Sequence, residues 1–513
     1  MPKEKGDCNA KKVVGLMFYK KDLPTKSQSS VKLSISNFSK GINTDKDQSV
    51  LDMNQSPLSY NFLYINGALK QGYGIGNVSL VDKTGTSYVV DSLYSDHEKF
   101  LKLWIYRSNP AYEGEATYAN IFIMDDTYHI YRIIFDYTFI PLLPYTATDG
   151  LFTQVPLSAV SYRYNSKDYL VMSSLADGVY LVDPAATNIK VNNAPKITSM
   201  CVHYERIFAT VQDNQNALWF CKEFDPTKWE IDGTGAGFIE MVDERGYLTK
   251  VISFLDYVYI FREYGIARLV GYADETEFVV SQIFSSSSKI YENTVCICGD
   301  VVLMLTGNGL YAFDGLNTKK INLGIDEMFE GQKNEDAVCC FYKGKYFLAC
   351  KLNYPDEYMA EEGEYVNNSL LVYDTETGEL SITRGIDIRD MAAIQETRNN
   401  KVVMIFRGDN ELLLGELNDS GKFFNVNLKK FWSSPKTDLG YGNKLKLIKE
   451  VYLESDYPCE LEVKCDNKIK KYSIKQGSNR IRINKRAKQL SLNIISTTGE
   501  ARITPPKVYL GVV

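Results

Sequence analysis

The stretch VVLMLTGNGLYAFDGLNTKKIN, from Val301 to Asn322, decides how this chain is interpreted. An apolar run leads into a Gly-rich turn at 306–309, a second apolar run follows, and Asp314-Gly315 forms the next turn. Gly and Asn supply the positive φ of tight hairpin turns, and the flanking β-branched and aromatic residues suit half-buried strands. The stretch therefore predicts a β-hairpin.

Variants of this hairpin recur between about residues 85 and 425. Mid-strand positions of successive units are spaced at roughly the 40–50 residues of a propeller blade, with insertions stretching some units. The units cover 101–135, 169–190, 206–229, 257–283, 301–322, 345–382 and 402–422. A closed ring of such units leaves few strand edges exposed. We therefore predict an all-β fold, a β-propeller of about seven blades, with an open sandwich of many strands as the competing architecture.

The composition changes on both sides of this region. Residues 1–30 are rich in Lys and indicate an extension that is mobile alone or ordered by a partner. Residues 31–84 predict an N-terminal strap with a hairpin turn at Asn66-Gly67. Residues 426–513 alternate apolar and polar side chains, which predicts a separate antiparallel β-sandwich. The predicted domains are thus 1–30, 31–84, 85–425 and 426–513.

Three segments are candidates for contacts with partners. The acidic insert 353–368 and the aromatic insert 138–150 are predicted to project from the ring, and loops on a rigid scaffold often carry contacts. The third segment is a basic strand edge, for which a solvated strand face and a surface for an acidic partner both remain open. It consists of Arg480, Arg482, Lys485, Arg486 and Lys488.

Composition and charge exclude several classes of protein. The chain has 513 residues, of which 44% are hydrophobic and 12% aromatic, enough for a large core. Its net charge of −6 argues against a dedicated nucleic-acid binder. It contains neither the roughly 18 uninterrupted apolar residues of a membrane span nor the apolar run of a secretory signal near its first residue. We therefore expect the protein to be made and assembled in a cytoplasm.

The residue types that carry chemistry form no recognisable site in the sequence. The ten Cys lack the spacing of a zinc site or a disulfide framework, which predicts buried free thiols. The three His, at positions 97, 129 and 203, lie in no catalytic motif, and His129 is expected to be half-buried in a strand. Tyr106, Tyr112, Tyr118 and Tyr354 could bind sugar or protein, although strand Tyr residues usually pack in the core.

Two short motifs resemble ligand loops but fit a structural role better. Gly72, Gly74 and Gly76 have the spacing GxGxG rather than GxGxxG, and no amphipathic helix follows them. The segment 374–379 resembles part of a calcium loop but lacks its length and terminal ligand, which indicates a hairpin turn. We predict no catalytic, cofactor-binding or metal-binding residue, no cofactor and no enzymatic activity.

Four segments resemble β-propeller tail proteins of bacteriophages, the tail stabilisation or nozzle proteins of short-tailed phages. The residues 38–44, followed by Pro57, Asn61-Phe62 and 66–70, are similar to the opening segment of that family. The residues 224–229, 246–248 and 257–267 resemble its mid-propeller pattern, and 309–315 its recurrent GxYxFDG hairpin. The residues 432–440, with the strand 480–486, resemble its closing β-domain. Residues 1–30 have no counterpart in this comparison.

This resemblance implies a structural virion protein without catalysis, part of a ring or hub around the DNA channel of a phage tail. Its implied partners are copies of itself in a homo-oligomeric ring and portal, adaptor or other tail proteins, without sequence-specific nucleic acid and without a membrane span. The implied location is the tail of a virion made in the bacterial cytoplasm. Two alternatives stay open: a receptor- or glycan-binding propeller on the tail, with or without glycosidase activity, and a bacterial cell-surface scaffold.

Overall fold

The computed structural model describes residues 31–35, 37–81, 86–89, 99–108, 119–133, 139–141, 151–183, 188–231, 233, 235–271, 277–355, 365–395, 399–407, 412–442 and 444–512. In these residues strands account for nearly all regular structure. The short helix α1 (Asp326–Phe329) and a 3-10 turn at Glu292–Thr294 supply the helical part. The prediction of an all-β chain is confirmed.

Six four-stranded antiparallel sheets follow one another along the described chain, and each is a meander of consecutive strands. We number them 1 to 6. Sheet 1 contains β8 (Phe100–Arg107), β9 (Ala119–Asp125), β10 (Ile130–Ile133) and β11 (Phe139–Pro141); sheet 2 contains β12 (Ser158–Tyr164), β13 (Lys167–Ser174), β14 (Gly178–Val182) and β15 (Ile189–Val191); sheet 3 contains β16 (Ile197–His203), β17 (Arg206–Val211), β18 (Ala217–Phe220) and β19 (Gly237–Glu240). Sheet 4 contains β20 (Leu248–Phe254), β21 (Tyr257–Arg262), β22 (Gly265–Val270) and β23 (Val279–Ser285); sheet 5 contains β24 (Cys296–Cys298), β25 (Val301–Thr306), β26 (Gly309–Phe313) and β27 (Thr318–Lys320); sheet 6 contains β28 (Val338–Tyr342), β29 (Lys345–Cys350), β30 (Ser369–Asp374) and β31 (Leu380–Arg384).

A further sheet, sheet 7, combines strands from two distant parts of the chain. It begins with β32 (Asp387–Gln395), β33 (Asn400–Arg407) and β34 (Leu412–Asn418). Its fourth strand is β5 (Gly74–Gly76), which pairs antiparallel with β34 and parallel with β35 (Lys422–Phe423). The short β36 (Val426–Asn427) completes the sheet, and β6 (Ser79–Val81) pairs with β7 (Ser87–Val89) beside it.

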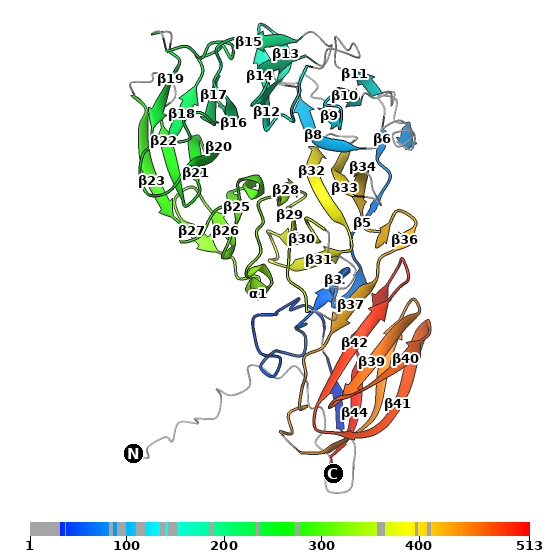
Figure 1. The fold of residues 1–513 in the computed structure, drawn as a ribbon. Coiled ribbons are helices and arrows are strands. Elements are labelled where there is room, and N and C mark those ends of the chain that lie inside the picture. The colour runs from blue at the N-terminus through cyan, green and yellow to red at the C-terminus, as the bar shows by residue number, and fades with distance from the viewer. Residues whose placement is uncertain are drawn as a thin grey trace, which may run out of the picture.

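The seven sheets form a propeller-like ring, seen from its axis in Figure 1. The first strand of each sheet lies nearest the centre, and first strands of neighbouring sheets contact each other, as β12 does with β16 and β28 with β32. The last sheet meets the first because β32 contacts β8. The ring is therefore closed by a sheet that borrows a strand from near the N-terminus.

The glycines of β5 allow this borrowed strand to fit. A Cβ atom at Gly74 would lie 2.7 Å from the backbone nitrogen of Lys422 and closer still to its carbonyl oxygen. A Cβ atom at Gly72 would lie 2.7 Å from the backbone of Asn61. Close approach of two backbones is a known reason for Gly within a strand. Residues 74–76, predicted to lie in the strap, belong to the ring, and the GxGxG spacing allows two backbones to pack closely.

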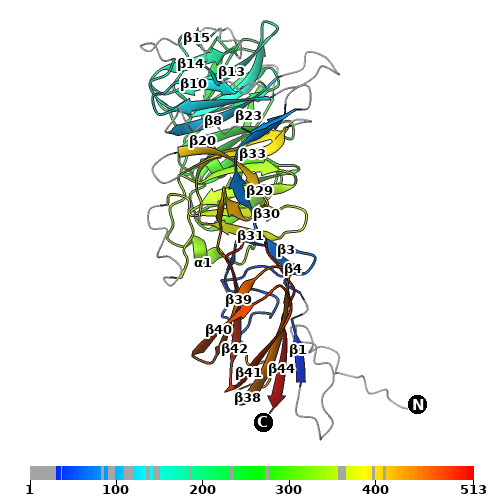
Figure 2. The ribbon, with the colours of Figure 1, turned by 90° about the vertical axis from the view of Figure 1, so that its right-hand side faces the viewer.

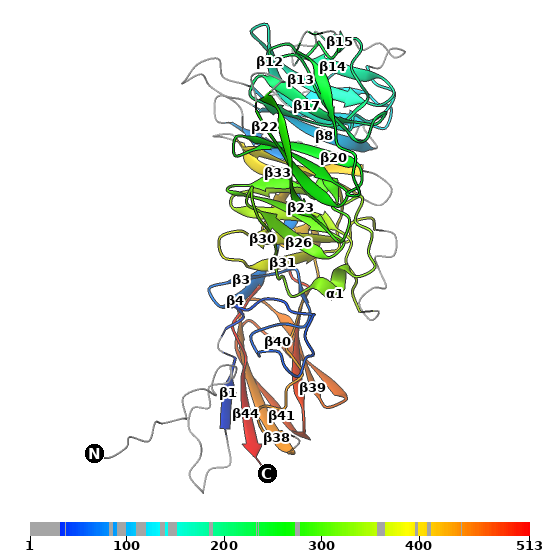
Figure 3. The same ribbon diagram turned by 90° about the vertical axis from the view of Figure 1, so that its left-hand side faces the viewer.

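Two more sheets lie beyond the rim of the ring, as the edge-on views show (Figures 2 and 3). One has the order β1-β44-β38-β43-β4-β3, with β41 also paired to β38, and the other has the order β2-β37-β42-β39-β40. The strap supplies β1 (Val31–Ser34), β2 (Ser59–Tyr60), β3 (Phe62–Ile65) and β4 (Ala68–Gln71). The other strands are β37 (Lys430–Ser433), β38 (Lys446–Ser455), β39 (Cys459–Cys465), β40 (Lys468–Ile474), β41 (Gly477–Ala487), β42 (Leu490–Ser496), β43 (Arg502–Ile503) and β44 (Lys507–Val512).

The strap ties these C-terminal sheets to the ring through a shared apolar core. Phe38 and Trp432 are both fully buried, and their rings meet edge to face at 4.8 Å between centroids. Leu305 of sheet 5 and Leu371 of sheet 6 belong to the same core cluster as Val451 of β38. The C-terminal strands were expected to form a separate unit, and they instead share strands and core with the strap and the ring.

Two local expectations differ from the structure. The recurring units marked mainly the second and third strands, so the first strands of sheets 2 to 7 were missed, because buried and exposed residues do not alternate regularly in these strands. Residues 139–141 form β11 rather than part of a projecting loop, while 142–150 lie outside the described residues. The acidic insert is flanked by β29 and β30 as expected, and its residues 356–364 also lie outside the described residues.

A buried lysine at the start of β37 makes folding stability depend on pH. Lys430 is fully buried, and its Nζ donates hydrogen bonds to the carbonyl oxygens of Thr498 (2.6 Å) and Leu428 (3.1 Å). Burial, with a smaller contribution from the charge on Lys422, lowers the pKa of Lys430 from 10.5 to about 8. At pH values between these two pKa values, Lys430 keeps its proton in the unfolded chain but has released it in the folded chain. This group therefore makes the protein more stable as pH rises from about 8 to about 10.5.

The variant Lys430→Met should remove this contribution. We expect the free energy of unfolding of the wild type, relative to the variant, to increase across that pH window and to stay constant below it. Urea denaturation of both proteins at pH values below, inside and above the window measures this difference in free energy. Buried Tyr and Cys residues titrate equally in both proteins, so their contribution cancels in the difference. The exposed neighbour Lys429 provides the control variant Lys429→Met. A wild-type advantage that is independent of pH would contradict the prediction.

Candidate functional site

A cavity of about 870 Å³ lies in the centre of the ring, and we call it the channel. Its wall is built from the first strands of all seven sheets, with residues such as Trp104 of sheet 1, Val251 of sheet 4 and Met391 of sheet 7. The inner edge of each first strand has no further strand to pair with, so its backbone N–H groups need other acceptors. Along the channel wall, side chains of the neighbouring sheet provide these acceptors.

Side chains of one sheet accept hydrogen bonds from backbone N–H groups of the next. The Ser158 hydroxyl of sheet 2 accepts from Met200 N at 3.0 Å, and the Ser199 hydroxyl of sheet 3 accepts from Val251 N at 3.2 Å. At the ring closure, the Asp390 carboxylate of sheet 7 accepts from Leu103 N of sheet 1 at 3.0 Å. Hydrogen bonds along the channel wall thus connect neighbouring sheets.

A repeated β-bulge puts polar residues in this position. The pairing register shifts just before Lys102, Ser199, Lys250 and Asp390, each in the first strand of its sheet. A bulge adds one unpaired residue and re-aims the next side chain. Lys102 and Asp390 form an ion pair, with Nζ and Oδ1 separated by 3.1 Å, across the boundary between sheets 1 and 7.

Lys250 occupies the bulge position of sheet 4, and its side chain makes no hydrogen bond or ion pair with the described residues. Its pKa is lowered, mainly because the half-buried channel wall disfavours the charged ammonium, and the charge of Lys102 acts in the same direction. A lysine cannot accept a hydrogen bond from the next sheet as Ser158 and Ser199 do. An unpaired ammonium in a cavity of this size can hold an anionic group, which makes Lys250 the best-placed binding residue of the channel.

Thiols lie near Lys250 on the channel wall. Burial, with a hydrogen bond to Cys296, raises the pKa of Cys339 well above its usual value, and burial does the same for Cys340. A neutral thiol is a poor nucleophile and a poor metal ligand. Cys339 and Cys340 point to opposite faces of β28, as expected, because they pack against different core clusters.

All nine Cys of the described residues are free, six of them buried and three half-buried. The prediction of buried free thiols is therefore confirmed for most of them, while Cys8 lies outside the described residues. Within those residues no group of three or more His, Cys, Asp or Glu is placed to hold a metal ion. The same part of the chain contains no helix with the length and apolar character of a transmembrane segment.

The closure of the ring at Asp390 can be tested directly. Asp390→Ala leaves the Leu103 N–H and the Lys102 ammonium without their acceptor, and we expect a loss of about 2–3 kcal/mol in the free energy of unfolding. Asp390→Asn keeps an acceptor for Leu103 and should cost clearly less. Urea denaturation of both variants gives the comparison. Equal stability of the alanine variant and the wild type would show that this contact does not hold the ring closed.

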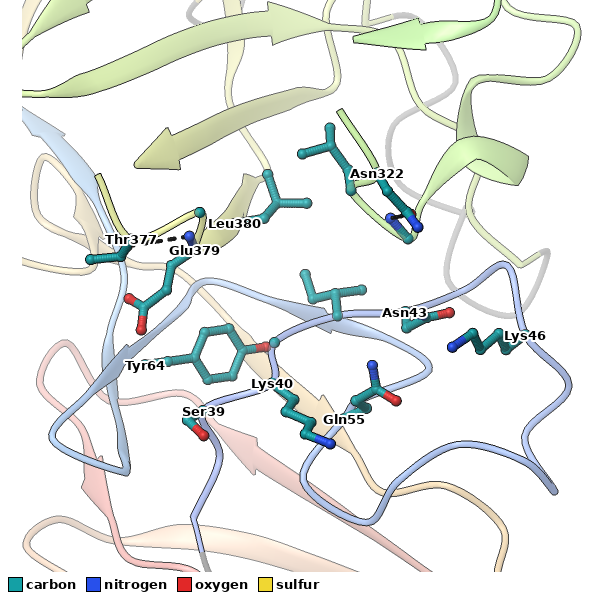
Figure 4. A pocket seen from close by; sticks show the side chains of 15 residues that line it. Ser39, Lys40, Asn43, Lys46, Gln55, Tyr64, Asn322, Thr377, Glu379 and Leu380 are labelled. Atoms are coloured by element: carbon teal, nitrogen blue, oxygen red, sulfur yellow. Dashed lines mark hydrogen bonds between the residues drawn. The ribbon is translucent and has the colours of Figure 1, made fainter. Parts of the chain in front are cut away.

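A second, smaller pocket of about 340 Å³ lies between the strap and the ring (Figure 4). Asn43 and Tyr64 come from the strap, and Glu379 extends toward Tyr64 from the turn between β30 and β31. The backbone of Thr44 donates a hydrogen bond to Gly324 O at 2.6 Å, which fastens the strap to sheet 5. Burial, with the nearby charge of Asp374, raises the pKa of Glu379. This pocket lies at the contact between the strap and the ring, and most of the residues that line it are polar.

The structure places the described His residues in structural contacts. His129 lies in the turn before β10, not in a strand, and its Nδ1 is 2.7 Å from the Thr127 hydroxyl. His203 is buried, its Nδ1 lies 2.8 Å from the Ser253 hydroxyl, and burial lowers its pKa. His97 lies outside the described residues.

The other singled-out residues are also structural. Asp374 accepts hydrogen bonds from the backbone of Glu376 and Thr377, which makes 374–379 a hairpin turn as predicted. Tyr106 stacks on Phe122, and Tyr354 is buried with its hydroxyl 2.7 Å from that of Ser369. Tyr112 and Tyr118 lie outside the described residues.

Sequence reasoning missed Lys250, Asp390 and the serines of the channel. Each is a polar residue followed by apolar residues, a pattern that many surface strands share. The bulges that aim these side chains at the neighbouring sheet depend on pairing between strands and leave no mark of their own in the sequence. The basic edge of β41 was located correctly, with Arg480 bound to Glu450 at 2.8 Å.

No protein-family model matches the sequence, and no curated protein matches it. Among solved structures, BBS1N in complex with ARL6DN is 10% identical with a TM-score of 0.37, covering 63% of this chain and 98% of that chain. PorZ, described as an essential bacterial surface component of the type-IX secretion system of Porphyromonas gingivalis, is 9% identical with a TM-score of 0.38. The match covers 75% of this chain and 48% of PorZ, so this chain spans about half of that protein. At these scores neither likeness bears on function.

Proposed function

We propose that the chain is a seven-bladed β-propeller with a C-terminal β-sandwich, and that it is a structural, non-enzymatic protein of a bacteriophage tail. In this proposal copies of the chain form a ring or hub around the DNA channel of the virion tail and contact portal-side or tail-side neighbours. The protein is made in the cytoplasm of the bacterial host. The support comes from the residues that resemble phage tail propellers and from the positions they occupy.

The contact between Phe38 and Trp432 carries the proposal. Phe38 belongs to the segment that resembles the opening of the phage proteins, and Trp432 to the segment that resembles their closing domain. The two side chains lie 394 residues apart in sequence, yet they pack edge to face in one core. Two independent stretches of resemblance therefore meet in space, as expected if they belong to one inherited fold.

The other two stretches also meet. The Tyr259 hydroxyl, in the mid-propeller pattern, donates a hydrogen bond to Gly315 O of the GxYxFDG hairpin at 3.0 Å. The Tyr259 ring meets Phe313 edge to face at 5.0 Å. Trp229 is buried and donates from Nε1 to Pro226 O at 2.9 Å, so the 224–229 segment folds as a compact turn. The motif residues thus hold neighbouring sheets together rather than surround one cavity, which fits a scaffold.

Mass spectrometry of purified particles of the encoding phage tests the proposal. We expect the chain in every particle, at a constant copy number that matches a symmetric ring, and retained after washing at high salt. A chain that is absent from the particles and strictly monomeric in solution would reject it.

A receptor- or glycan-binding role remains a second candidate because of Lys250. Its unpaired ammonium on the wall of the channel would suit an acidic sugar. Glycan arrays and polysaccharide-cleavage assays with the purified protein, each with Lys250→Met as the control, test this role. Binding that the substitution abolishes would favour it, and a negative result in both assays would remove it.

A further inference from the structure

We infer that one face of sheets 3 to 5 is a docking surface for a second copy of this chain, an inference that rests on the ring assembly proposed above. The surface consists of four exposed apolar side chains, which we call the apolar arc. They are Tyr204, Phe224, Leu255 and Leu316, with exposed fractions of 47%, 63%, 52% and 64%.

The topology puts the four residues at the same end of the strands. Tyr204 and Leu255 lie in the turns between the first and second strands of sheets 3 and 4. Phe224 and Leu316 follow the third strands of sheets 3 and 5. In an antiparallel meander these two kinds of connection leave the sheet at the same end. All four residues therefore belong to one face of the ring.

Hydrogen bonds bring the members of the arc side by side. Phe224 N donates to Glu205 O at 3.0 Å, which sets Phe224 beside the Tyr204 turn. The bond from Tyr259 to Gly315 O draws the Leu316 loop toward sheet 4, and a Cβ atom at Gly315 would lie 3.4 Å from Leu255 Cδ1. The arc thus consists of two adjacent pairs, Tyr204 with Phe224 on sheet 3 and Leu255 with Leu316 on sheets 4 and 5.

Three members of the arc are held in a backbone conformation that disfavours them. Tyr204, Phe224 and Leu255 have φ of +50°, +58° and +46°. Bulky side chains are rare in this left-handed region, where Gly and Asn are preferred. Such strain concentrates at functional positions because folding alone does not select for it.

The equivalent turns that the structure describes in sheets 2, 5 and 6 are polar or contain glycine. Sheet 2 has Asn165-Ser166, sheet 5 has Gly299-Asp300 and sheet 6 has Lys343-Gly344. A hairpin turn at this position therefore does not need a large apolar residue. Among these five described turns, only those of the neighbouring sheets 3 and 4 have a large apolar residue, which points to a contact made there.

Acidic residues surround the arc. Glu205, Asp256, Asp300 and Asp314 are exposed at the same connections, and none forms an ion pair with the described residues. The partner surface should therefore combine an apolar side chain with positive charge.

The chain itself carries such a surface on its C-terminal sheets. β40 and β41 are joined by a short turn, and each pairs with one neighbour only, β39 or β38. Ile469 of β40 is 54% exposed. Lys468 and Lys470 flank Ile469 in β40 and are exposed, and β41 carries the exposed Arg482 and Arg486; none of the four has an acidic side chain within ion-pair distance in the described part of the chain. The basic edge seen in the sequence thus fits the apolar arc of another copy.

The two surfaces are different, so the contact is heterologous and runs from the arc of one copy to the basic edge of the next. Such contacts propagate head to tail and close into a ring when the rotation between copies allows it. This supplies a concrete interface for the ring assembly.

The test measures self-association and folding stability of the full chain together. Leu255→Gly and Phe224→Gly remove an apolar contact and also relieve the disfavoured backbone conformation. We expect sedimentation velocity to show at least about tenfold weaker self-association for each variant, while the thermal unfolding temperature stays equal or rises. A loss of association with a gain in stability cannot come from misfolding. Gly178→Ala, at a turn far from the arc, is the control that should leave association unchanged.

Charge variants identify the partner surface. Asp256→Lys and Arg486→Glu should each weaken association, and an equimolar mixture of the two should restore it, because both contacts between unlike variants are complementary, one with the wild-type charges and one with the charges exchanged. Raising the salt from about 0.1 M to about 1 M should weaken wild-type association, since screening shortens from about 10 Å to about 3 Å.

The outcomes separate this inference from the proposed function. A wild-type chain that stays monomeric, or glycine variants that associate like the wild type, would overturn the inferred surface. If particles nevertheless contain the chain, the proposed function stands without this interface. If the surface mediates association but particles lack the chain, the interface stands and the phage assignment fails.

Discussion

Replacing Gly74 by alanine is expected to destabilise the protein by about 3 kcal/mol, at the upper end for overpacking a site that cannot relax. The new methyl group would lie 2.7 Å from Lys422 N and closer to Lys422 O, both backbone atoms. A flexible side chain could move aside, but the paired strands β5 and β35 cannot do so without losing their hydrogen bonds. The substitution should therefore detach the strand that closes the ring.

Urea denaturation followed by tyrosine and tryptophan fluorescence measures this effect. Gly307→Ala is the matched control, because the nearest atom to a Cβ there is Ser288 Cβ at 3.5 Å, an ordinary contact. The control should change stability by no more than about 0.5 kcal/mol. If Gly74→Ala were as stable as Gly307→Ala, β5 would not be needed to complete sheet 7.

Replacing Trp432 by alanine is expected to cost about 3–5 kcal/mol, the range for removing a large aromatic side chain from a core. Trp432 is fully buried, pairs with Ser59 of the strap and packs against Phe38. Its loss would open a cavity where the strap, the ring and the C-terminal sheets meet. We expect the strap to become sensitive to limited proteolysis near residues 38–62 at temperatures that leave the wild type intact.

Trp219→Ala provides the comparison. Trp219 is half-buried and stacks on Phe238, a side chain that is itself 39% exposed. Its loss should cost about 1 kcal/mol, the value of one aromatic pair near the surface. Similar losses for the two tryptophans would mean that the Phe38–Trp432 contact does not join the parts of the molecule as we describe.

The repeating hairpins could be predicted from the sequence because their signals are local. Thr306 to Gly309 is a Gly-rich turn in which Gly309 has a φ of +109°, and apolar strands flank it. The same local pattern, two apolar runs separated by turn residues, located most second and third strands. It also predicted the turn at 374–379, where Asp374 binds the backbone of the residues that follow it.

The ring closure and the C-terminal sheets could not be predicted in the same way. β5 pairs with β34 across more than three hundred residues, and β1 to β4 enter sheets built mainly from the last eighty residues. Such pairing depends on the complete fold, and the short strands carry no local mark of it. The GxGxG spacing signalled a close approach, but the sequence could not show which backbone came close.

The channel residues were hidden for a related reason. Asp390 and Lys250 take their positions from bulges, which arise where two strands pair out of register. The apolar arc was hidden because Tyr204 and Leu255 look like ordinary strand residues until their backbone conformation is known. The basic edge at 480–488 could be predicted because its cluster of Arg and Lys residues can be read directly from the sequence.

The most direct test of the proposed tail role is a reconstruction, by cryo-electron microscopy, of the tail of the phage that this proposal requires to encode the chain. We predict seven-bladed wheels of this chain arranged symmetrically around the DNA channel, each with its C-terminal sheets against the apolar arc of a neighbouring copy. A tail without density for this chain, or with single copies only at the tips of its fibres, would contradict a structural role in the ring.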